Sequence, residues 1–242
     1  MTESPPAKEA ARISGMFDAI AASYDLLNHL LSAGRDRHWR RRAVAALQLS
    51  GRETVLDLCT GTADLALAAG GGRAHRVIGI DFSGEMLRIG RHKVSRVGSP
   101  KPAAIDLIRG DATRIPLADA TVDAVTIGFG IRNVEQPFVA CREIARVLRQ
   151  NGKLVILEFS LPRSPVLRSF YLWYFRHVLP LIGHAISGHA SAYTYLPESV
   201  QAFPSPGEFL QQLRGAGFGT ARAIPLTFGI VHMFVAEKGD AP

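Results

Sequence analysis

From residue 54 onward, the sequence alternates short apolar runs with segments of helical periodicity. The runs that we interpret as strands are 54–59, 77–81, 105–109, 122–129, 153–159, 219–226 and 230–236. Between them lie stretches with helical spacing, such as 83–97, 137–148 and 206–216. Strands that alternate with helices pair in parallel, and the helices cover both faces of the sheet. Gly229, between the last two runs, indicates a tight turn and hence an antiparallel hairpin. The sequence therefore predicts an α/β fold with a doubly wound, mostly parallel, seven-stranded sheet.

Three segments lie outside this alternation. Residues 1–13 are polar and contain two prolines, so we expect a disordered arm. Residues 14–49 have apolar positions at helical spacing, which predicts N-terminal helices. Residues 161–204 are rich in aromatic residues and prolines, and we expect them to form a helical lid. We assign the N-terminal helices and the lid to one domain, 14–242, because single α/β domains often reach this length.

The chain is basic, with a formal net charge of +7. Five of the eight residues from Arg35 to Arg42 are arginines. Such a cluster is either a solvated helix face or a surface for an anionic partner. No nucleic-acid motif, aromatic platform or zinc spacing accompanies it. We therefore expect no nucleic acid and prefer a membrane surface as the partner.

No apolar run approaches the roughly 20 residues that span a bilayer, and the polar N-terminus lacks the apolar core of a signal peptide. We therefore expect a cytoplasmic protein in peripheral contact with the inner face of the membrane. Cys59 and Cys141 are far apart in sequence, so they predict two reduced thiols rather than a disulfide or a metal site, and we expect no metal.

In a doubly wound sheet, ligands bind outside the carboxyl ends of the strands. Gly61 follows the first strand, where a missing side chain allows a tight turn and a close ligand approach. Asp81 ends the second strand and can accept two hydrogen bonds from a ribose diol. The structural alternatives are a turn glycine and a helix-capping aspartate. Taken together, the two residues predict a nucleoside site.

The glycine pattern of this loop argues against a dinucleotide cofactor. Where the G-x-G-x-x-G fingerprint has its three glycines, this chain has Gly61, Ala63 and Ala66, so no pyrophosphate cradle is evident. S-adenosylmethionine has no phosphate to hold. Asp111 and Ala112, after the third strand, offer an acceptor for an adenine amino group and a backbone N–H. We therefore favour S-adenosylmethionine over a nicotinamide cofactor, and a reductase remains the alternative enzyme.

Several longer segments resemble the ubiquinone/menaquinone biosynthesis C-methyltransferase family. The most specific are the F-G-x-R-N and Y-x-Y-L-x-x-S patterns. The segments are Met16–Ala21, Ser23–Asp25, Leu30–Gly34, Gly61–Asp64, Asp81–Leu87, Phe129–Val134, Leu157–Ser160 and Tyr193–Val200. The resemblance extends from about residue 14 to 237, and it implies the Rossmann-like fold of class I S-adenosylmethionine-dependent methyltransferases.

The resemblance also implies contacts with the cofactor. It places them at Thr62, Asp81, Asp111 and Ala112. This chain departs from the family at Gly128, where a serine is frequent, which leaves a backbone contact at that position. Thr60 and Ala63 occupy positions at which the family commonly has glycine. The side chain of Ala63 leaves less room for the methionine end of the cofactor.

A ring carbon becomes a good nucleophile when a neighbouring hydroxyl loses its proton. The site therefore needs a polar group that promotes this loss and stabilises the oxyanion. Arg132 and Asn133, after the fourth strand, fit this role, and Tyr24 is a further candidate that closes the pocket. In the alternative interpretation, Arg132 pairs with Glu135 on the surface, Asn133 starts a turn, and Tyr24 is a core aromatic residue.

The substrate predicted by the resemblance is a prenylated hydroquinone. The Thr60–Thr62 loop resembles that of family members that serve menaquinone alone, which favours demethylmenaquinol. A ubiquinol precursor, 2-methoxy-6-polyprenyl-1,4-benzoquinol, is the alternative. A non-catalytic scaffold in a quinone-synthesis assembly is a third hypothesis. Aromatic and basic residues between 163 and 182 suit a headgroup interface. A homodimer is compatible with the sequence.

Overall fold

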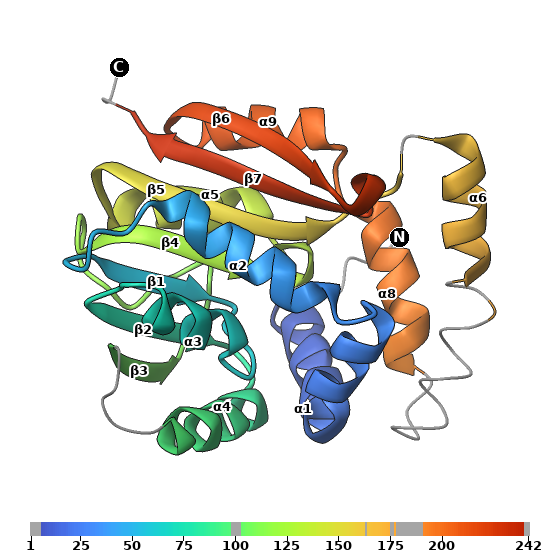
Figure 1. Cartoon of the computed structure of the whole chain (residues 1–242), viewed down its shortest axis with the longest axis horizontal. Coiled ribbons are helices and arrows are strands. Elements are labelled where there is room, and N and C mark those ends of the chain that lie inside the picture. Colours follow the sequence, from blue (N-terminus) through green and yellow to red (C-terminus); the bar gives the residue numbers. More distant parts are fainter. Residues whose placement is uncertain (1–5, 98–102, 163, 175–176, 178–190, 240–242) are drawn as a thin grey trace.

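The computed structural model describes residues 6–97, 103–162, 164–174, 177 and 191–239. Within these residues, seven strands form one sheet in the order β3-β2-β1-β4-β5-β7-β6 (Figure 1). Strands β1 to β5 run parallel, whereas β7 is antiparallel to both of its neighbours. The strands are β1 (Thr54–Leu58), β2 (Arg76–Asp81), β3 (Ala104–Arg109), β4 (Val122–Gly128), β5 (Leu148–Phe159), β6 (Phe218–Leu226) and β7 (Val231–Lys238). The predicted doubly wound, mostly parallel sheet is confirmed.

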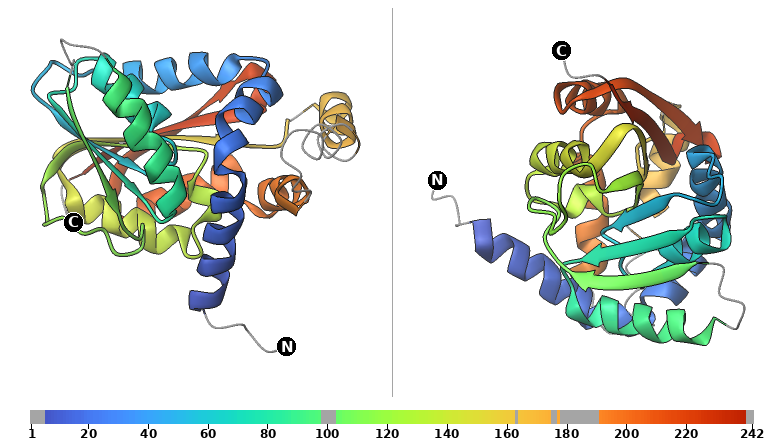
Figure 2. Two further views of the ribbon diagram at one scale, coloured as in Figure 1. Left: turned by 90° about the horizontal axis from the view of Figure 1, so that it is seen from below. Right: turned by 90° about the vertical axis from the view of Figure 1, so that its left-hand side faces the viewer.

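Helices cover both faces of this sheet. On one face lie α2 (Arg35–Leu47), α3 (Asp64–Gly71) and α4 (Gly84–Arg96), and on the other lie α5 (Pro137–Val147) and α9 (Pro206–Gly215), as Figure 2 shows. Successive strand residues contact opposite faces, as the pleat requires. Val55 packs in the core under α2 and α3, and Leu56 packs in the core under α5 and α9.

Among the described residues, three further helices lie beyond the carboxyl ends of the parallel strands. They are α1 (Pro6–Leu31), α6 (Pro165–Trp173) and α8 (Ser191–Ala202). A small apolar cluster joins α1 to α6, with Ile20 and Tyr171 buried at its centre. This arrangement places the N-terminal helix and the described part of the predicted lid at the edge of the sheet where ligands bind. Residues 178–190 of that lid lie outside the described residues.

Two boundaries differ from the sequence prediction. Helix α1 begins at Pro6, so residues 6–13 are helical where we expected a disordered arm; residues 1–5 lie outside the described part of the chain. Proline is tolerated in the first turn of a helix because its missing N–H has no partner there anyway. Strand β5 begins at Leu148 rather than at residue 153, and it contains a bulge at Asn151, which has φ 60°. No helix among the described residues is long and apolar enough to cross a membrane.

Candidate functional site

A cavity of ≈460 Å³ lies at the carboxyl ends of β1 to β4. Its walls come from the loops that follow these strands and from one side of α1. This volume is typical of small-molecule sites, and its position is the one at which doubly wound sheets bind ligands. Of the predicted site residues, seven line the cavity: Tyr24, Gly61, Asp81, Asp111, Ala112, Gly128 and Asn133.

Gly61 and Asp81 lie side by side at the tips of β1 and β2. The Gly61 N–H donates to Asp81 Oδ2 over 2.7 Å, and the Ser83 N–H donates to Oδ1 over 2.9 Å. Each carboxylate oxygen therefore keeps a lone pair for a ligand. Burial raises the pKa of Asp81, and the hydrogen bonds from Ser83 and Gly61 oppose that rise. A Cβ added at Gly61, where φ is +55°, would meet no atom within 4 Å, so this backbone faces open space.

The next two loops supply smaller features of the cavity. Asp111 Oδ1 accepts hydrogen bonds from the Thr113 N–H and hydroxyl, both at 2.8 Å, which fixes the start of the loop after β3. Ala112 is buried beside it. A Cβ at Gly128 would lie 3.2 Å from Leu65 Cδ2, so a serine in its place would crowd the first turn of α3. Gly128 contributes backbone to the wall of the cavity.

Asn133 and Tyr24 line the cavity from two different elements, the segment after β4 and helix α1. Asn133 ends the short 3-10 helix η1 (Ile131–Asn133), and its Nδ2 donates to the Phe129 carbonyl over 3.4 Å. Its Oδ1 is buried and has no hydrogen-bond partner among the described residues. Such an atom costs free energy unless a ligand or water satisfies it. Burial raises the pKa of Tyr24, and a hydrogen bond to Asn28 partly offsets that rise.

Arg132 does not line the cavity. Its Nη1 lies 2.6 Å from Glu158 Oε1 and donates to the Phe129 carbonyl over 2.6 Å, and its Nε donates to Ser199 Oγ of α8 over 3.3 Å. It therefore pairs with Glu158 rather than with Glu135, the surface partner considered from the sequence. The Phe129 carbonyl that it holds is the one that Asn133 contacts. The Phe129 carbonyl therefore links the Arg132 side chain to that of Asn133.

Thr62 also lies behind the wall of the cavity rather than on it. Its side chain is 2% exposed, and its hydroxyl donates to Asp25 Oδ1 of α1 over 2.5 Å. The family resemblance placed Thr62 among the cofactor contacts. The structure shows that neighbouring residues of a tight loop point in different directions.

The sequence interpretation missed two contributors to the site. Phe17 of α1 lines the cavity one heptad before Tyr24, a spacing that puts both rings on one side of the helix. Asp57 lies beneath the loop, where it accepts hydrogen bonds from the hydroxyls of Thr60 (2.5 Å) and Thr126 (2.7 Å). Burial raises the pKa of Asp57 to about 6. An acidic residue inside an apolar strand was the signal for it.

Known proteins with similar sequences cover nearly the whole chain. Residues 6–238 match the ubiE/COQ5 methyltransferase family. The "Ubiquinone/menaquinone biosynthesis C-methyltransferase UbiE" of Syntrophotalea carbinolica is 49% identical, over 90% of this chain and 91% of the relative. The "Demethylmenaquinone methyltransferase" of Deinococcus radiodurans is 46% identical, over 93% and 92%.

Solved structures with the same fold are more distant in sequence. A SAM-dependent methyltransferase from Aquifex aeolicus has a TM-score of 0.60 at 19% identity, over 82% of this chain and 89% of that one. The [4+2]-cyclase SpnF has a TM-score of 0.66 at 16% identity, over 96% and 97%. Since the second is named a cyclase, this likeness establishes the fold and not the reaction.

The match over residues 6–238 and the identities near one half agree with the motifs read from the sequence. They confirm the resemblance and the predicted class of enzyme, a methyltransferase that depends on S-adenosylmethionine. We conclude that the chain belongs to the ubiE/COQ5 methyltransferase family.

Proposed function

We propose that this protein transfers the methyl group of S-adenosylmethionine to a ring carbon of a prenylated hydroquinone, and that demethylmenaquinol is its substrate. The observation that carries the proposal is the buried, unpartnered Oδ1 of Asn133 in the same cavity as Asp81. One end of that cavity suits a nucleoside, and the other offers a polar acceptor for a ring hydroxyl. The names of the relatives support the substrate class.

The residues of the cavity fit the cofactor. Both Asp81 oxygens retain acceptor capacity for a ribose diol, and the open space in front of Gly61 admits a ligand against the backbone. Asp111 and Ala112 lie on the side where an adenine would reach. When bound, S-adenosylmethionine supplies an electrophilic methyl group. The chain supplies alignment, from which much of the rate of such a displacement comes.

The substrate side of the cavity is built to handle a phenolic proton. Asn133 Oδ1 accepts the hydrogen bond of the ring hydroxyl and so orients it; when the hydroxyl ionises, its proton passes to solvent water, because a neutral amide does not take it up. Tyr24 keeps its proton at neutral pH, as any tyrosine with a pKa of 10 or above does, and burial raises its pKa further; it donates to the oxyanion that forms. Arg132, neutralised by Glu158, holds the Phe129 carbonyl and with it the position of Asn133.

One experiment separates the proposed substrate from its rivals. The purified enzyme is given S-adenosylmethionine with a trideuterated methyl group, and either reduced demethylmenaquinone or the reduced ubiquinone precursor. Mass spectrometry should show the labelled methyl on the menaquinol ring. Faster turnover of the ubiquinol precursor would show that this compound, rather than demethylmenaquinol, is the substrate. Binding of S-adenosylhomocysteine without turnover of either quinol would favour the scaffold hypothesis.

We also propose that the protein contacts the inner face of the membrane peripherally, where a prenylated quinol resides. Four arginines, Arg35, Arg37, Arg41 and Arg42, are exposed on α2, and none forms an ion pair within the described part of the chain. Beside them, the indole N–H of Trp39 donates to Thr227, whose neighbour Phe228 is 82% exposed. Basic and aromatic side chains together suit anionic headgroups.

A homodimer stays a prediction, which light scattering tests.

A further inference from the structure

Helix α1 is attached to α4 at two points. Asp18 Oδ1 accepts hydrogen bonds at the first turn of α4, from the Ser83 hydroxyl (2.5 Å) and the Glu85 N–H (3.2 Å). Asp25 reaches the other end of α4, where Lys93 Nζ lies 2.8 Å from its Oδ2. The two carboxylates are seven residues apart and therefore share one face of α1. The neighbouring face carries Phe17 and Tyr24 into the cavity.

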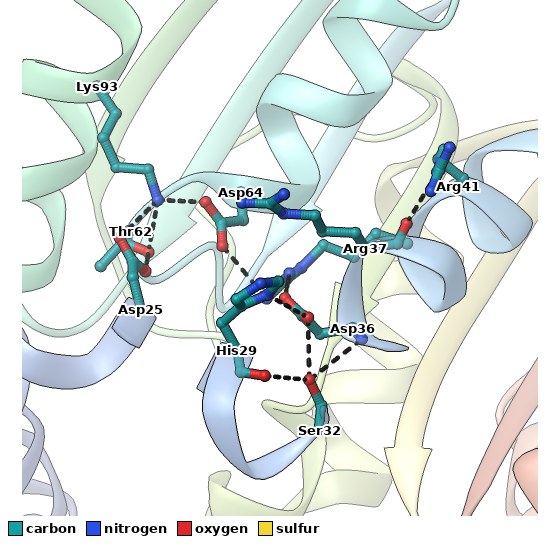
Figure 3. Close-up of polar contacts among 10 residues, drawn as sticks. Asp25, His29, Ser32, Asp36, Arg37, Arg41, Thr62, Asp64 and Lys93 are labelled. Carbon is teal, nitrogen blue, oxygen red and sulfur yellow. Dashed lines mark hydrogen bonds and ion pairs between the residues drawn. The ribbon is translucent and has the colours of Figure 1, made fainter. Parts of the chain in front are cut away.

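Lys93 joins three different elements at its ammonium group. Besides Asp25 of α1, it pairs with Asp64 at the first residue of α3, and it donates to Thr62 Oγ1 over 3.2 Å in the loop after β1 (Figure 3). An ammonium group has three protons to donate, and each of these acceptors takes one. All three contacts are partly shielded from solvent, since the Lys93 side chain is 25% exposed.

The network extends to the corner between α1 and α2. Asp64 also pairs with Arg40 of α2, at 3.3 Å, and Arg40 pairs with Asp36. Asp36 Oδ1 in turn accepts from the hydroxyl of Ser32, the residue directly after α1, over 2.9 Å. It also lies 3.1 Å from Nδ1 of His29, in the last turn of α1 (Figure 3). The carboxylate of Asp64 thus connects the start of α3 to α2 and, through Lys93, to α1.

The corner itself bends through two residues in the left-handed region. Ala33 has φ 49° and Gly34 has φ 73°, and they separate α1 from α2. A Cβ at Gly34 would lie 3.2 Å from His29 Cε1. The backbone therefore connects α1 to α2 only by this short turn. Its position over the cavity depends on side-chain contacts such as those of Asp25.

We propose that Lys93 is a positioning residue for the cofactor, because its bridge between Asp25 and Asp64 holds α1 closed over the cavity. The inference rests on the proposed function, since it assigns a role in binding the same cofactor. The connection to the site is short: Asp25 accepts from Thr62, Thr62 adjoins Gly61, and the Gly61 N–H donates to Asp81. A protein whose lid is closed for a smaller fraction of the time binds its ligand with a proportionally weaker apparent affinity.

The test compares Lys93→Met with Arg88→Met. Both residues are cations on α4, but among the described residues Arg88 pairs only with Glu85 of its own helix, and its side chain is 67% exposed. Calorimetry should show a dissociation constant for S-adenosylhomocysteine that is about tenfold higher in Lys93→Met and unchanged in Arg88→Met. Steady-state kinetics should show a higher KM for S-adenosylmethionine, with a smaller change in kcat.

A second measurement needs neither cofactor nor turnover. Hydrogen exchange in the unliganded protein should become faster in Met16–Leu31 of Lys93→Met, with no change in β1 or β4. Lys93→Arg keeps the charge and should restore slow exchange and the wild-type dissociation constant. Asp25→Asn should reproduce the effect of Lys93→Met, and the double variant should add little to either single one.

The outcomes are distinct. Unchanged exchange in α1, together with an unchanged dissociation constant in Lys93→Met, would overturn the proposal. So would an equal loss of affinity in Arg88→Met, or faster exchange throughout the sheet, because Lys93 would then contribute only to general stability. Failure of the wild-type protein to bind S-adenosylhomocysteine would instead contradict the proposed function, and the exchange experiment would still test the contact between α1 and α4.

Discussion

The guanidinium of Arg132 and the carboxylate of Glu158 form an ion pair of 2.6 Å that is closed off from solvent, with side chains 8% and 0% exposed. Glu158 also accepts from the Arg132 and Phe159 N–H groups, at 3.2 and 2.8 Å. The plane of Arg132 lies over the ring of Phe159, at 5.5 Å from its centroid. The pair therefore joins the loop after β4 to the end of β5, and the Phe129 carbonyl links it to Asn133.

Replacing Glu158 with Gln should destabilise the protein strongly, because it leaves Arg132 buried without a countercharge. Loss of one partner of a buried pair costs about 3–5 kcal/mol. Urea denaturation of Glu158→Gln measures this change. The control is Asp106→Asn, which breaks the exposed pair with Arg76 and should cost at most about 1 kcal/mol. Equal losses of stability in the two variants would show that the buried pair of Arg132 stabilises the protein no more than the exposed pair does.

Replacing Asn133 with Ala should lower kcat by about a hundredfold or more, because the ring hydroxyl loses the acceptor that orients it. The dissociation constant of S-adenosylhomocysteine should stay the same, since Asp81 and Gly61 are untouched. Gln201→Ala, on the exposed side of α8, is the matched control. If the variant retains full kcat and loses only cofactor affinity, Asn133 contacts the nucleoside rather than the ring hydroxyl.

Asp57 predicts a pH dependence of stability. Burial raises its pKa in the folded protein from 3.8 to about 6, so the folded state binds the proton more tightly than the unfolded state. The resulting stabilisation is complete below about pH 4 and is lost as the pH rises through 6; this rise in pKa corresponds to about 3 kcal/mol. The free energy of unfolding of the wild type, minus that of Asp57→Asn, should therefore fall between pH 4 and 7.

Above pH 7 the difference should be constant, because Asp57 is then ionised in both states. Urea denaturation at each pH gives the two curves, and the subtraction removes every group that both proteins share. A difference that stays flat from pH 4 to 7 would mean that the hydroxyls of Thr60 and Thr126 compensate fully for the burial of the carboxylate.

The arginines of α2 should determine binding to anionic vesicles. Each basic residue near such a surface contributes about 1 kcal/mol, so Arg35→Gln/Arg42→Gln should weaken partitioning about 20- to 30-fold. Sedimentation with vesicles that contain phosphatidylglycerol measures this, and added salt should abolish it. Arg142→Gln/Arg214→Gln, which removes the same number of charges from α5 and α9 at the opposite face of the sheet, is the control. Binding that responds equally to both changes would reflect net charge rather than a docking face.

The fold was predictable because the apolar runs of the parallel sheet are long and separated by clear turns. The hairpin of β6 and β7 was predictable from Gly229, which has φ +85° in the turn between them. The start of α1 was not, because prolines near its first turn are equally typical of a disordered arm. The bulge at Asn151 was hidden because an Asn-Gly pair ordinarily ends a strand.

The grouping of the candidate cofactor residues at the strand tips was predictable, because it follows from backbone position. Gly61, Asp81 and Asp111 occupy the tips of adjacent parallel strands, and the sheet topology alone brings them together. The directions of the Thr62 and Arg132 side chains were not predictable in this way. Both depend on partners distant in the sequence, Asp25 and Glu158, whose positions follow from packing.

The loop after β1 has left-handed backbone at alternate residues, with φ 54° at Cys59, 55° at Gly61 and 68° at Ala63. Side-chain-bearing residues resist this conformation by roughly 1–2 kcal/mol each, and the segment alone would relax to another shape. Its geometry is imposed by Asp57, Asp81 and Asp25, which lie on three separate elements. Ligand affinity should therefore emerge late during refolding, after the sheet and the N-terminal helix have assembled around the turn.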